Sequence, residues 1–328
     1  MDIFTSSIDS VPIMGGVYQF TDDAPVVVSG DGLKWLGYEN VGANYEPGFY
    51  YGKDGETGVS DSGKLADYIG KGKIVLDIGC GLGGSAISFA KAGLCVIAAD
   101  ISQNMLEIAV KRAEKLNAPK ENLIFVRMNG YKLELDDNSV DAVLAQDVLF
   151  QVDRPELMMA EILRVLKPGG YFLQYGNGKN LGFTPEQEAV NQLYNDAYKD
   201  ISDYYNKAIG EGGYAEPAFK SWDKADECIN KNFKQIKKIE GTGVYAADNL
   251  EWSLKIGLHK IKTRASGAKS VFIPDELHDG AWRKTDEYAQ MKYGEDYEDI
   301  VRFYNHESVM IVYKRRQNLI KGIINKFK

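Results

Sequence analysis

The segment from Ile74 to Ser85 reads IVLDIGCGLGGS, and it decides how the rest of the chain is interpreted. It begins as a mainly apolar run and continues into a cluster of glycines that starts at Gly79. Glycine is needed where the backbone turns tightly and lets a ligand lie against it. The next residues, SAISFAKAG, fit a helix. The segment therefore predicts a strand, a glycine-rich loop and a helix, with a ligand site at the loop.

Apolar runs and amphipathic stretches alternate after this loop. The runs are CVIAAD (95–100), LIFVRM (123–128), VDAVLAQ (140–146) and YFLQYG (171–176), and the intervening stretches include MLEIAVKRAEKL (105–116) and RPELMMAEILRVL (154–166). Such alternation of strands and helices indicates parallel βαβ units. We therefore expect an α/β fold in which helices cover both faces of a twisted sheet.

The remaining segments predict additions to this sheet. Residues 1–60 show no sustained period and predict an irregular arm with a short helix or hairpin. A long helical stretch follows Thr184, a second helix lies near residues 223–230, and a sixth strand covers 233–239. The last strand (308–314) follows the sixth without another clear crossover pattern, which predicts an antiparallel pair at the sheet edge.

The glycine loop is compatible with two kinds of cofactor. Gly79, Gly81 and Gly84 satisfy GxGxxG, and Asp100 lies near the offset of the ribose-binding acid in NAD(P)-binding folds. However, Asp77 precedes the first glycine by two residues, where its charge would repel a pyrophosphate and attract an ammonium group. S-adenosylmethionine (SAM) carries such an ammonium group. This acid, the late start of the domain and the antiparallel last strand favour SAM.

Three motifs together resemble class I SAM-dependent methyltransferases: VLDIGCGLGGS, the acid-ended AAD at Asp100, and LKPGG (166–170). The resemblance covers roughly residues 40–176. The segment AQDVLFQVDRPE (145–156) is similar to small-molecule methyltransferases of the phosphoethanolamine and sarcosine/dimethylglycine type. The resemblance implies a Rossmann-like, doubly wound sheet of seven strands with an antiparallel last strand. It also implies SAM as methyl donor, S-adenosylhomocysteine (SAH) as product and a small-molecule substrate.

The same resemblance implies a set of cofactor-binding residues. Asp77 and the glycines would border the methionine part of SAM, and Asp100 would accept both ribose hydroxyls. Ile101 would pack on the adenine, and Asn129 stands where the family has an Asp for the adenine amino group. Gln146 would lie under the sulfonium. The full set is Ser60, Asp77, Gly79, Cys80, Gly81, Gly83, Asp100, Ile101, Met105, Asn129, Gly130 and Gln146.

The catalytic residues are less well defined by the resemblance. Gln151 occupies the position of the family's catalytic His, and Gln cannot act as a general base near neutral pH. Methyl transfer is an in-line displacement that is accelerated largely by alignment of the nucleophile, so catalysis does not require this His. Two alternatives stay open, an NAD(P)-dependent oxidoreductase and a non-catalytic SAM-binding protein. The candidate catalytic residues are Gln151, Tyr45 in the arm, His278 and His306.

The resemblance and the pattern together predict how the chain is divided. Residues 1–60 form an arm that closes over the cofactor, 61–183 the SAM-binding core, 184–232 a helical cap, and 245–304 a lid insertion. The last core strands lie in residues 233–244 and 305–314. Residues 315–328 form a basic amphipathic tail, which we expect to be a helix that packs on the sheet or contacts a second copy in a homodimer.

Composition excludes several classes of partner. The 328 residues carry a formal net charge of −8, whereas nucleic-acid binding needs clustered Lys and Arg. The cysteines, Cys80, Cys95 and Cys228, are odd in number and lack CxxC spacing, so we expect no disulfide framework and no metal site. The sequence shows no signal peptide and no run of ~20 apolar residues. We expect a cytoplasmic protein without integral membrane association.

Overall fold

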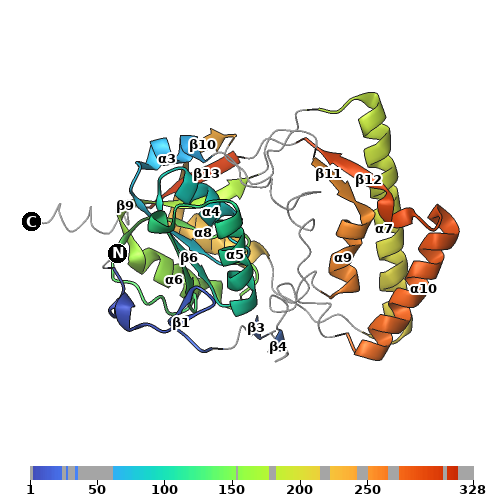
Figure 1. Ribbon diagram of the computed structural model, residues 1–328, viewed down its shortest axis with the longest axis horizontal. Coiled ribbons are helices and arrows are strands. Elements are labelled where there is room, and N and C mark those ends of the chain that lie inside the picture. Colours follow the sequence, from blue (N-terminus) through green and yellow to red (C-terminus); the bar gives the residue numbers. More distant parts are fainter. Residues whose placement is uncertain are drawn as a thin grey trace, which may run out of the picture.

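The computed structural model describes ten ranges of the chain: residues 3–23, 27–28, 34–35, 62–152, 154–176, 182–214, 222–241, 250–264, 273–305 and 309–316. Figure 1 shows that they form two lobes side by side. The larger lobe, called the core here, contains the sheet. The smaller lobe, called the lid, is mostly helical and comprises residues 182–214, 250–264 and 273–305.

A mixed sheet runs through the core. Its order is β1-β2-β7-β6-β5-β8-β9-β13-β10. The strands are β1 (Ile13–Met14), β2 (Val17–Gln19), β5 (Ile74–Ile78), β6 (Cys95–Asp100), β7 (Leu123–Arg127), β8 (Val140–Leu144), β9 (Leu166–Gly176), β10 (Phe233–Glu240) and β13 (Val309–Arg315). The five strands β7, β6, β5, β8 and β9 are parallel, and β13 lies antiparallel between β9 and β10. The predicted antiparallel last strand is therefore confirmed.

The predicted count of seven strands is wrong for the described residues, which form nine strands in this sheet. The two extra strands, β1 and β2, are the hairpin of the N-terminal arm, and β2 pairs in parallel with β7. Without this addition β7 would be an edge strand with a row of unpaired backbone groups. A short helix η1 (Ile8–Ser10) precedes the hairpin, so the arm contains both elements that the sequence offered as alternatives. A further two-residue pair joins β3 (Val27–Val28) to β4 (Lys34–Trp35).

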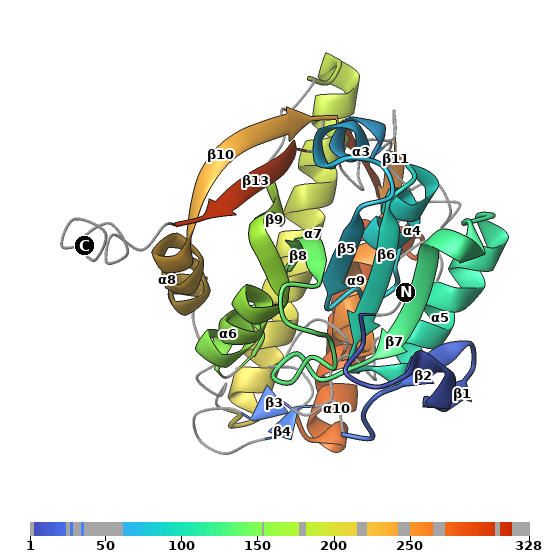
Figure 2. The same cartoon turned by 90° about the vertical axis from the view of Figure 1, so that its left-hand side faces the viewer.

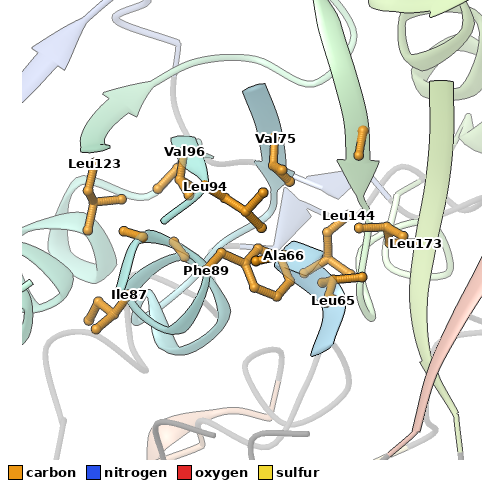
Figure 3. Close-up of a cluster of buried hydrophobic side chains, with 14 of the residues drawn as sticks. Leu65, Ala66, Val75, Ile87, Phe89, Leu94, Val96, Leu123, Leu144 and Leu173 are labelled. Carbon is orange, nitrogen blue, oxygen red and sulfur yellow. The ribbon is translucent and has the colours of Figure 1, made fainter. Parts of the chain in front are cut away.

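Helices cover both faces of the sheet. On one face lie α3 (Gly63–Ile69), α4 (Gly84–Lys91) and α5 (Gln103–Lys115), whose apolar side chains form one buried cluster with β5 and β6 (Figure 3). On the other face lie α6 (Pro155–Val165) and α8 (Trp222–Asn232). Side chains alternate across a strand, so Val75 faces the first cluster and Leu76 the second. The turn η2 (Lys120–Asn122) leads into β7.

The position of α8 corrects the predicted cap of residues 184–232. Ala225 and Ile229 of α8 are buried in the same cluster as Ile162 of α6, so this helix belongs to the core. The physical reason is the apolar stripe of α8, which needs a buried surface and finds it beside the sheet. Of the described residues in the predicted cap, only those up to 214 therefore belong to the lid.

The lid has an apolar core of its own. It consists of α7 (Pro185–Glu211), β11 (Leu250–Ser253), α9 (Leu254–Lys262), α10 (Asp275–Tyr293), η4 (Tyr297–Asp299) and β12 (Val301–Tyr304). Helix α7 begins with a capping box in which Thr184 and Gln187 satisfy each other's backbone amides. Tyr194, Leu254 and Tyr297 are among the residues that pack together in its centre. The predicted insertion 245–304 therefore contributes to a folded unit, together with α7.

The lid is joined to the core at one edge of the sheet. Val309 is paired with Gly176 on one side and with Glu240 on the other, so these three residues form a row at the carboxyl end of β9. In the chain, each of these three residues borders a segment that connects the core with the lid. At the lid end of two of these segments, Asn305 donates a hydrogen bond of 2.8 Å to the carbonyl of Gly182. In Figure 2 the lid helices lie behind the sheet. Ligands of open α/β sheets bind at this carboxyl edge.

Two predicted segments are only partly described. The tail (315–328) is described only to Arg316, and the arm is described at residues 3–23, 27–28 and 34–35. Within the described ranges, no helix combines the length and the apolar character needed to cross a membrane.

Candidate functional site

The glycine loop between β5 and α4 is fixed against the end of β6. The backbone amides of Gly79 and Cys80 both donate to the carbonyl of Ala99, at 2.8 and 3.0 Å. The amide of Gly81 donates to Oδ2 of Asp100 at 2.8 Å. Gly79, Gly81 and Gly83 have φ angles of 71°, 52° and 74°, which glycine adopts without strain. The loop is therefore a rigid turn whose conformation requires its glycines.

These glycines have different neighbours. A Cβ atom on Gly79 would lie 2.8 Å from Cγ2 of Val148, in the loop after β8, and one on Gly81 would lie 3.3 Å from Cε of Met105. A Cβ atom on Gly83 would lie 3.0 Å from Cβ of Ala109 in α5. Gly83, which the sequence assigns to the cofactor, thus lets α4 pack closely on α5.

Asp77 is a buried carboxyl group beside this loop. Asp77 is 3% exposed, and its Oδ2 atom has no hydrogen-bond partner in the described part of the chain. Burial, and secondarily the nearby Asp100, raise the pKa of Asp77 to about 7, although a hydrogen bond with the backbone of Ala86 acts in the opposite direction. Native structures rarely bury a polar atom without a partner, so such an atom needs an explanation. A cationic ligand group would supply the missing interaction.

Asp100 ends β6 next to Asp77 and has a fixed orientation. Its Oδ2 accepts from the amide of Gly81, and its Oδ1 accepts from the amide of Ser102 at 2.9 Å. Ser102 in turn caps α5 by accepting from the amide of Met105. A carboxylate has two oxygens that each accept more than one hydrogen bond, so this group type is suited to two adjacent hydroxyl groups.

The end of β7 holds a second polar group. Asn129 accepts from the amide of Tyr131 at 2.9 Å and donates 2.8 Å to Oδ2 of Asp23 in the N-terminal arm. Arg127 donates to the carbonyl of Asp23 at 2.7 Å and to that of Ile101 at 3.1 Å. Sequence reasoning missed Asp23 and Arg127, because no local pattern shows which strand end an arm residue reaches.

The strand order separates the two cofactor hypotheses. NAD(P)-binding sheets have the parallel order 3-2-1-4-5-6, whereas here an antiparallel strand is inserted between the fifth and sixth core strands. Residues 76–174 match the family model described as a methyltransferase domain. The chain carries a class I, SAM-dependent methyltransferase domain.

Known proteins resemble this chain over part of its length. A demethylmenaquinone methyltransferase of Clavibacter sepedonicus is 39% identical over 99 residues, which are 30% of this chain and 39% of that protein. The sterol 24-C-methyltransferase ERG6 of Saccharomyces cerevisiae is 34% identical over 108 residues, 33% of this chain and 28% of that protein. The solved structure of the YcgJ protein from Bacillus subtilis aligns with a TM-score of 0.43 and 16% identity, over 79% of this chain and 99% of that chain. The match to the family model ends before the lid begins.

The methyltransferase domain fits SAM at the residues described above. The unpartnered Oδ2 of Asp77 is suited to the ammonium group of the methionine part, and the oriented carboxylate of Asp100 to the two ribose hydroxyls. Ile101 follows Asp100 directly in the chain, and Met105 lies in the first turn of α5 with its Cε atom close to Gly81. In the part of the chain that the structure describes, no cluster of His, Cys, Asp and Glu side chains is arranged to hold a metal ion.

The loop after β8 carries the remaining predicted residues of the methyltransferase domain. Oε1 of Gln146 accepts from the amide of Tyr175 at 2.7 Å, so this side chain bridges β8 and β9. Asp147 has a φ angle of 54°, a strained conformation for a residue other than glycine. The side-chain amide of Gln151 donates to the carbonyl of Asp147. Gly130 packs on α6, since a Cβ atom there would lie 2.4 Å from Cε of Met158.

His278, a predicted catalytic residue, lies in the lid and is held there by hydrogen bonds. The imidazole projects from α10 and is buried between α7 and α9: Nδ1 is 2.7 Å from the hydroxyl of Tyr205, and Nε2 is 3.0 Å from the carbonyl of Lys262. Burial lowers the pKa of His278 below its ordinary value of 6.5. Both ring nitrogens are therefore used by structural hydrogen bonds. Tyr45, Ser60 and His306 lie outside the described residues.

Proposed function

We propose that this protein transfers the methyl group of SAM to a nitrogen, oxygen, sulfur or carbon atom of a small molecule. The observation that carries this proposal is the buried Oδ2 atom of Asp77, which has no hydrogen-bond partner among the described residues and lies near the oriented carboxylate of Asp100. When bound, SAM supplies an electrophilic methyl group on a positively charged sulfur.

Each residue of the site has a distinct task in this proposal. Asp77 pairs with the ammonium group, and the loop amides hold Asp100 so that it accepts the ribose hydroxyls without reorganisation. Gln146, fixed by the amide of Tyr175, determines the shape of the site at the end of β8. These contacts hold the donor in one orientation, and alignment contributes much of the acceleration of a displacement reaction.

Proton transfer is the step for which this chain departs from the family it resembles. Gln151 donates its amide to Asp147 and does not bind protons near neutral pH. We therefore propose that the acceptor enters in its reactive protonation state, or that Tyr45 or His306 receives its proton.

The lid is proposed to select the acceptor. It is joined to the core at the carboxyl edge of the sheet, where its closure would exclude water from the reacting groups. The names of two relatives state demethylmenaquinone and a sterol as substrates, and both are small molecules. The region that matches the family model ends at residue 174, before the lid, so we propose that lid residues determine which acceptor this protein binds.

The setting of the reaction is proposed from composition. A formal net charge of −8 supports a small-molecule substrate over nucleic acid, and three cysteines without pairing pattern support a cytoplasmic location. A homodimer through the basic tail is the corresponding proposal for assembly.

Calorimetric titration with SAM, SAH and NADH tests the proposal first. We expect SAM and SAH to bind and NADH not to bind. Asp100→Ala should weaken binding at least about 100-fold. Asp141→Asn changes an acid outside the site, between Lys73 and Lys167, and should leave binding intact. Incubation with tritiated SAM and a pool of metabolites should then release SAH. Binding without any release would support a non-catalytic SAM-binding protein, and binding of NADH alone would refute the assignment.

A further inference from the structure

Topology determines where the adenine end of the cofactor lies, given the proposed function on which this inference rests. Asp77 belongs to β5 and Asp100 to the neighbouring strand β6, and the next strand in the same direction is β7. A nucleoside whose methionine part lies at β5 and whose ribose lies at β6 therefore extends its base toward the end of β7. Asn129 follows that end by two residues.

The amide of Asn129 has one orientation that satisfies both of its neighbours. Its oxygen faces the backbone N–H of Tyr131, and its nitrogen faces the carboxylate of Asp23. A rotated amide would place N–H against N–H on one side and oxygen against carboxylate on the other. The N–H of Tyr131 and the carboxylate of Asp23 thus determine on which side of the Asn129 amide the acceptor oxygen lies.

Asp23 is itself held in place by the core. Phe20 donates its amide to the carbonyl of Arg127 at 3.0 Å, and Arg127 donates to the carbonyls of Asp23 and Ile101. The arm is thereby tied to the residue that follows Asp100. The hydrogen bond from Asn129 lowers the pKa of Asp23, so this exposed carboxyl group is ionised at neutral pH.

We infer that Asp23 is a positioning residue for cofactor recognition: it orients and polarises the Asn129 amide so that its oxygen accepts a hydrogen bond from the adenine amino group. A carboxylate that accepts from the amide nitrogen increases the negative charge on the amide oxygen, because hydrogen bonds in a chain polarise one another. The pair Asp23–Asn129 then does the work of a single carboxylate at the end of β7. It distinguishes an amino group at this position of the purine from a carbonyl group.

The test compares SAH with S-inosyl-L-homocysteine, in which a carbonyl oxygen replaces the adenine amino group. The wild-type protein should bind SAH more tightly, because the carbonyl would face the Asn129 oxygen. Asp23→Ala should reduce the ratio of the two affinities by about tenfold, the effect of one hydrogen bond. Asp22→Ala, at the neighbouring exposed acid, is the matched control and should leave the ratio unchanged.

A double variant separates positioning from support of the arm. Asp23→Ala combined with Asn129→Asp supplies a carboxylate directly and should restore the preference for SAH. An unchanged ratio in Asp23→Ala, including equal weakening of both ligands, would overturn the inference while leaving the proposed function intact. A wild-type protein that binds neither ligand would refute the proposed function itself, and the inference with it.

Discussion

Replacing Asp77 by Asn should make the ligand-free protein more stable above neutral pH and weaken SAH binding. Burial raises the pKa of Asp77 from 3.8 to about 7 in the folded protein. Between these values the unfolded chain ionises this group while the folded protein keeps its proton, so the free energy of unfolding falls as pH rises. Above pH 7 both states are ionised and the full loss is present.

The magnitude follows from the size of the shift. A change from 3.8 to about 7 corresponds to a loss of about 4 kcal/mol at pH 8 and to less than half of that loss at pH 5. Asparagine has no charge, so the variant avoids both losses. Its unpartnered amide costs a further amount that does not depend on pH. The stability gained by Asp77→Asn should therefore be about 3 kcal/mol larger at pH 8 than at pH 5.

Thermal unfolding without ligand at the two pH values measures this difference, and titration with SAH measures the lost ion pair. Affinity should fall about 100-fold or more, as for other buried charge pairs that lose one member. Asp141→Asn is the control, because the pKa of Asp141 is shifted in the opposite direction to that of Asp77. Burial alone would raise the pKa of Asp141, but the amide of Ile74 and the ammonium groups of Lys167 and Lys73 lower it. Equal effects of Asp77→Asn at both pH values, or unchanged SAH affinity, would refute the reasoning.

Three further changes test other parts of the structure. Asp100→Ala should reduce SAH affinity at least about 100-fold in calorimetry, since it removes the acceptors fixed by the loop. Gly83→Ala should cost about 1–3 kcal/mol in denaturant unfolding, because of its positive φ and the close Ala109, whereas Gly210→Ala in open space should gain about 0.5–1 kcal/mol. The lowered pKa of His278 means that the wild-type protein loses thermal stability as pH falls through 6.5, because the unfolded chain binds a proton more readily than the folded protein. His278→Gln should reduce this loss and should leave SAH affinity unchanged.

The core of the fold follows from local pattern. Strands β5 to β9 are short apolar runs separated by amphipathic helices, and each signal lies within one segment of the chain. The arm hairpin was also predicted, but its attachment to β7 was not. Strands β2 and β7 lie about a hundred residues apart, and neither local sequence indicates which strand it pairs with. Helix α8 was placed in the cap for the same reason, since its apolar stripe does not indicate which surface it covers.

Some residues of the candidate site could likewise be predicted from the sequence, and others could not. The glycines, Asp77 and Asp100 are predictable because their spacing along one strand–loop–helix unit carries the chemistry. The surroundings of His278 were not predictable, since a single histidine gives no information about its neighbours until Tyr205 and the carbonyl of Lys262 are located, and its catalytic role stays a prediction. Tyr45, Ser60 and His306 remain predictions.

The sequence by itself determined that a rigid glycine turn with two acids begins a parallel α/β unit, because that information is local and periodic. The tertiary structure alone decided that Asp77 is buried with an oxygen that no described residue pairs, that the lid joins the core at the carboxyl edge, and that Asp23 reaches Asn129. Burial, electrostatic coupling and hydrogen bonding depend on distances between residues that are remote in the chain, and those distances exist only after the chain has folded.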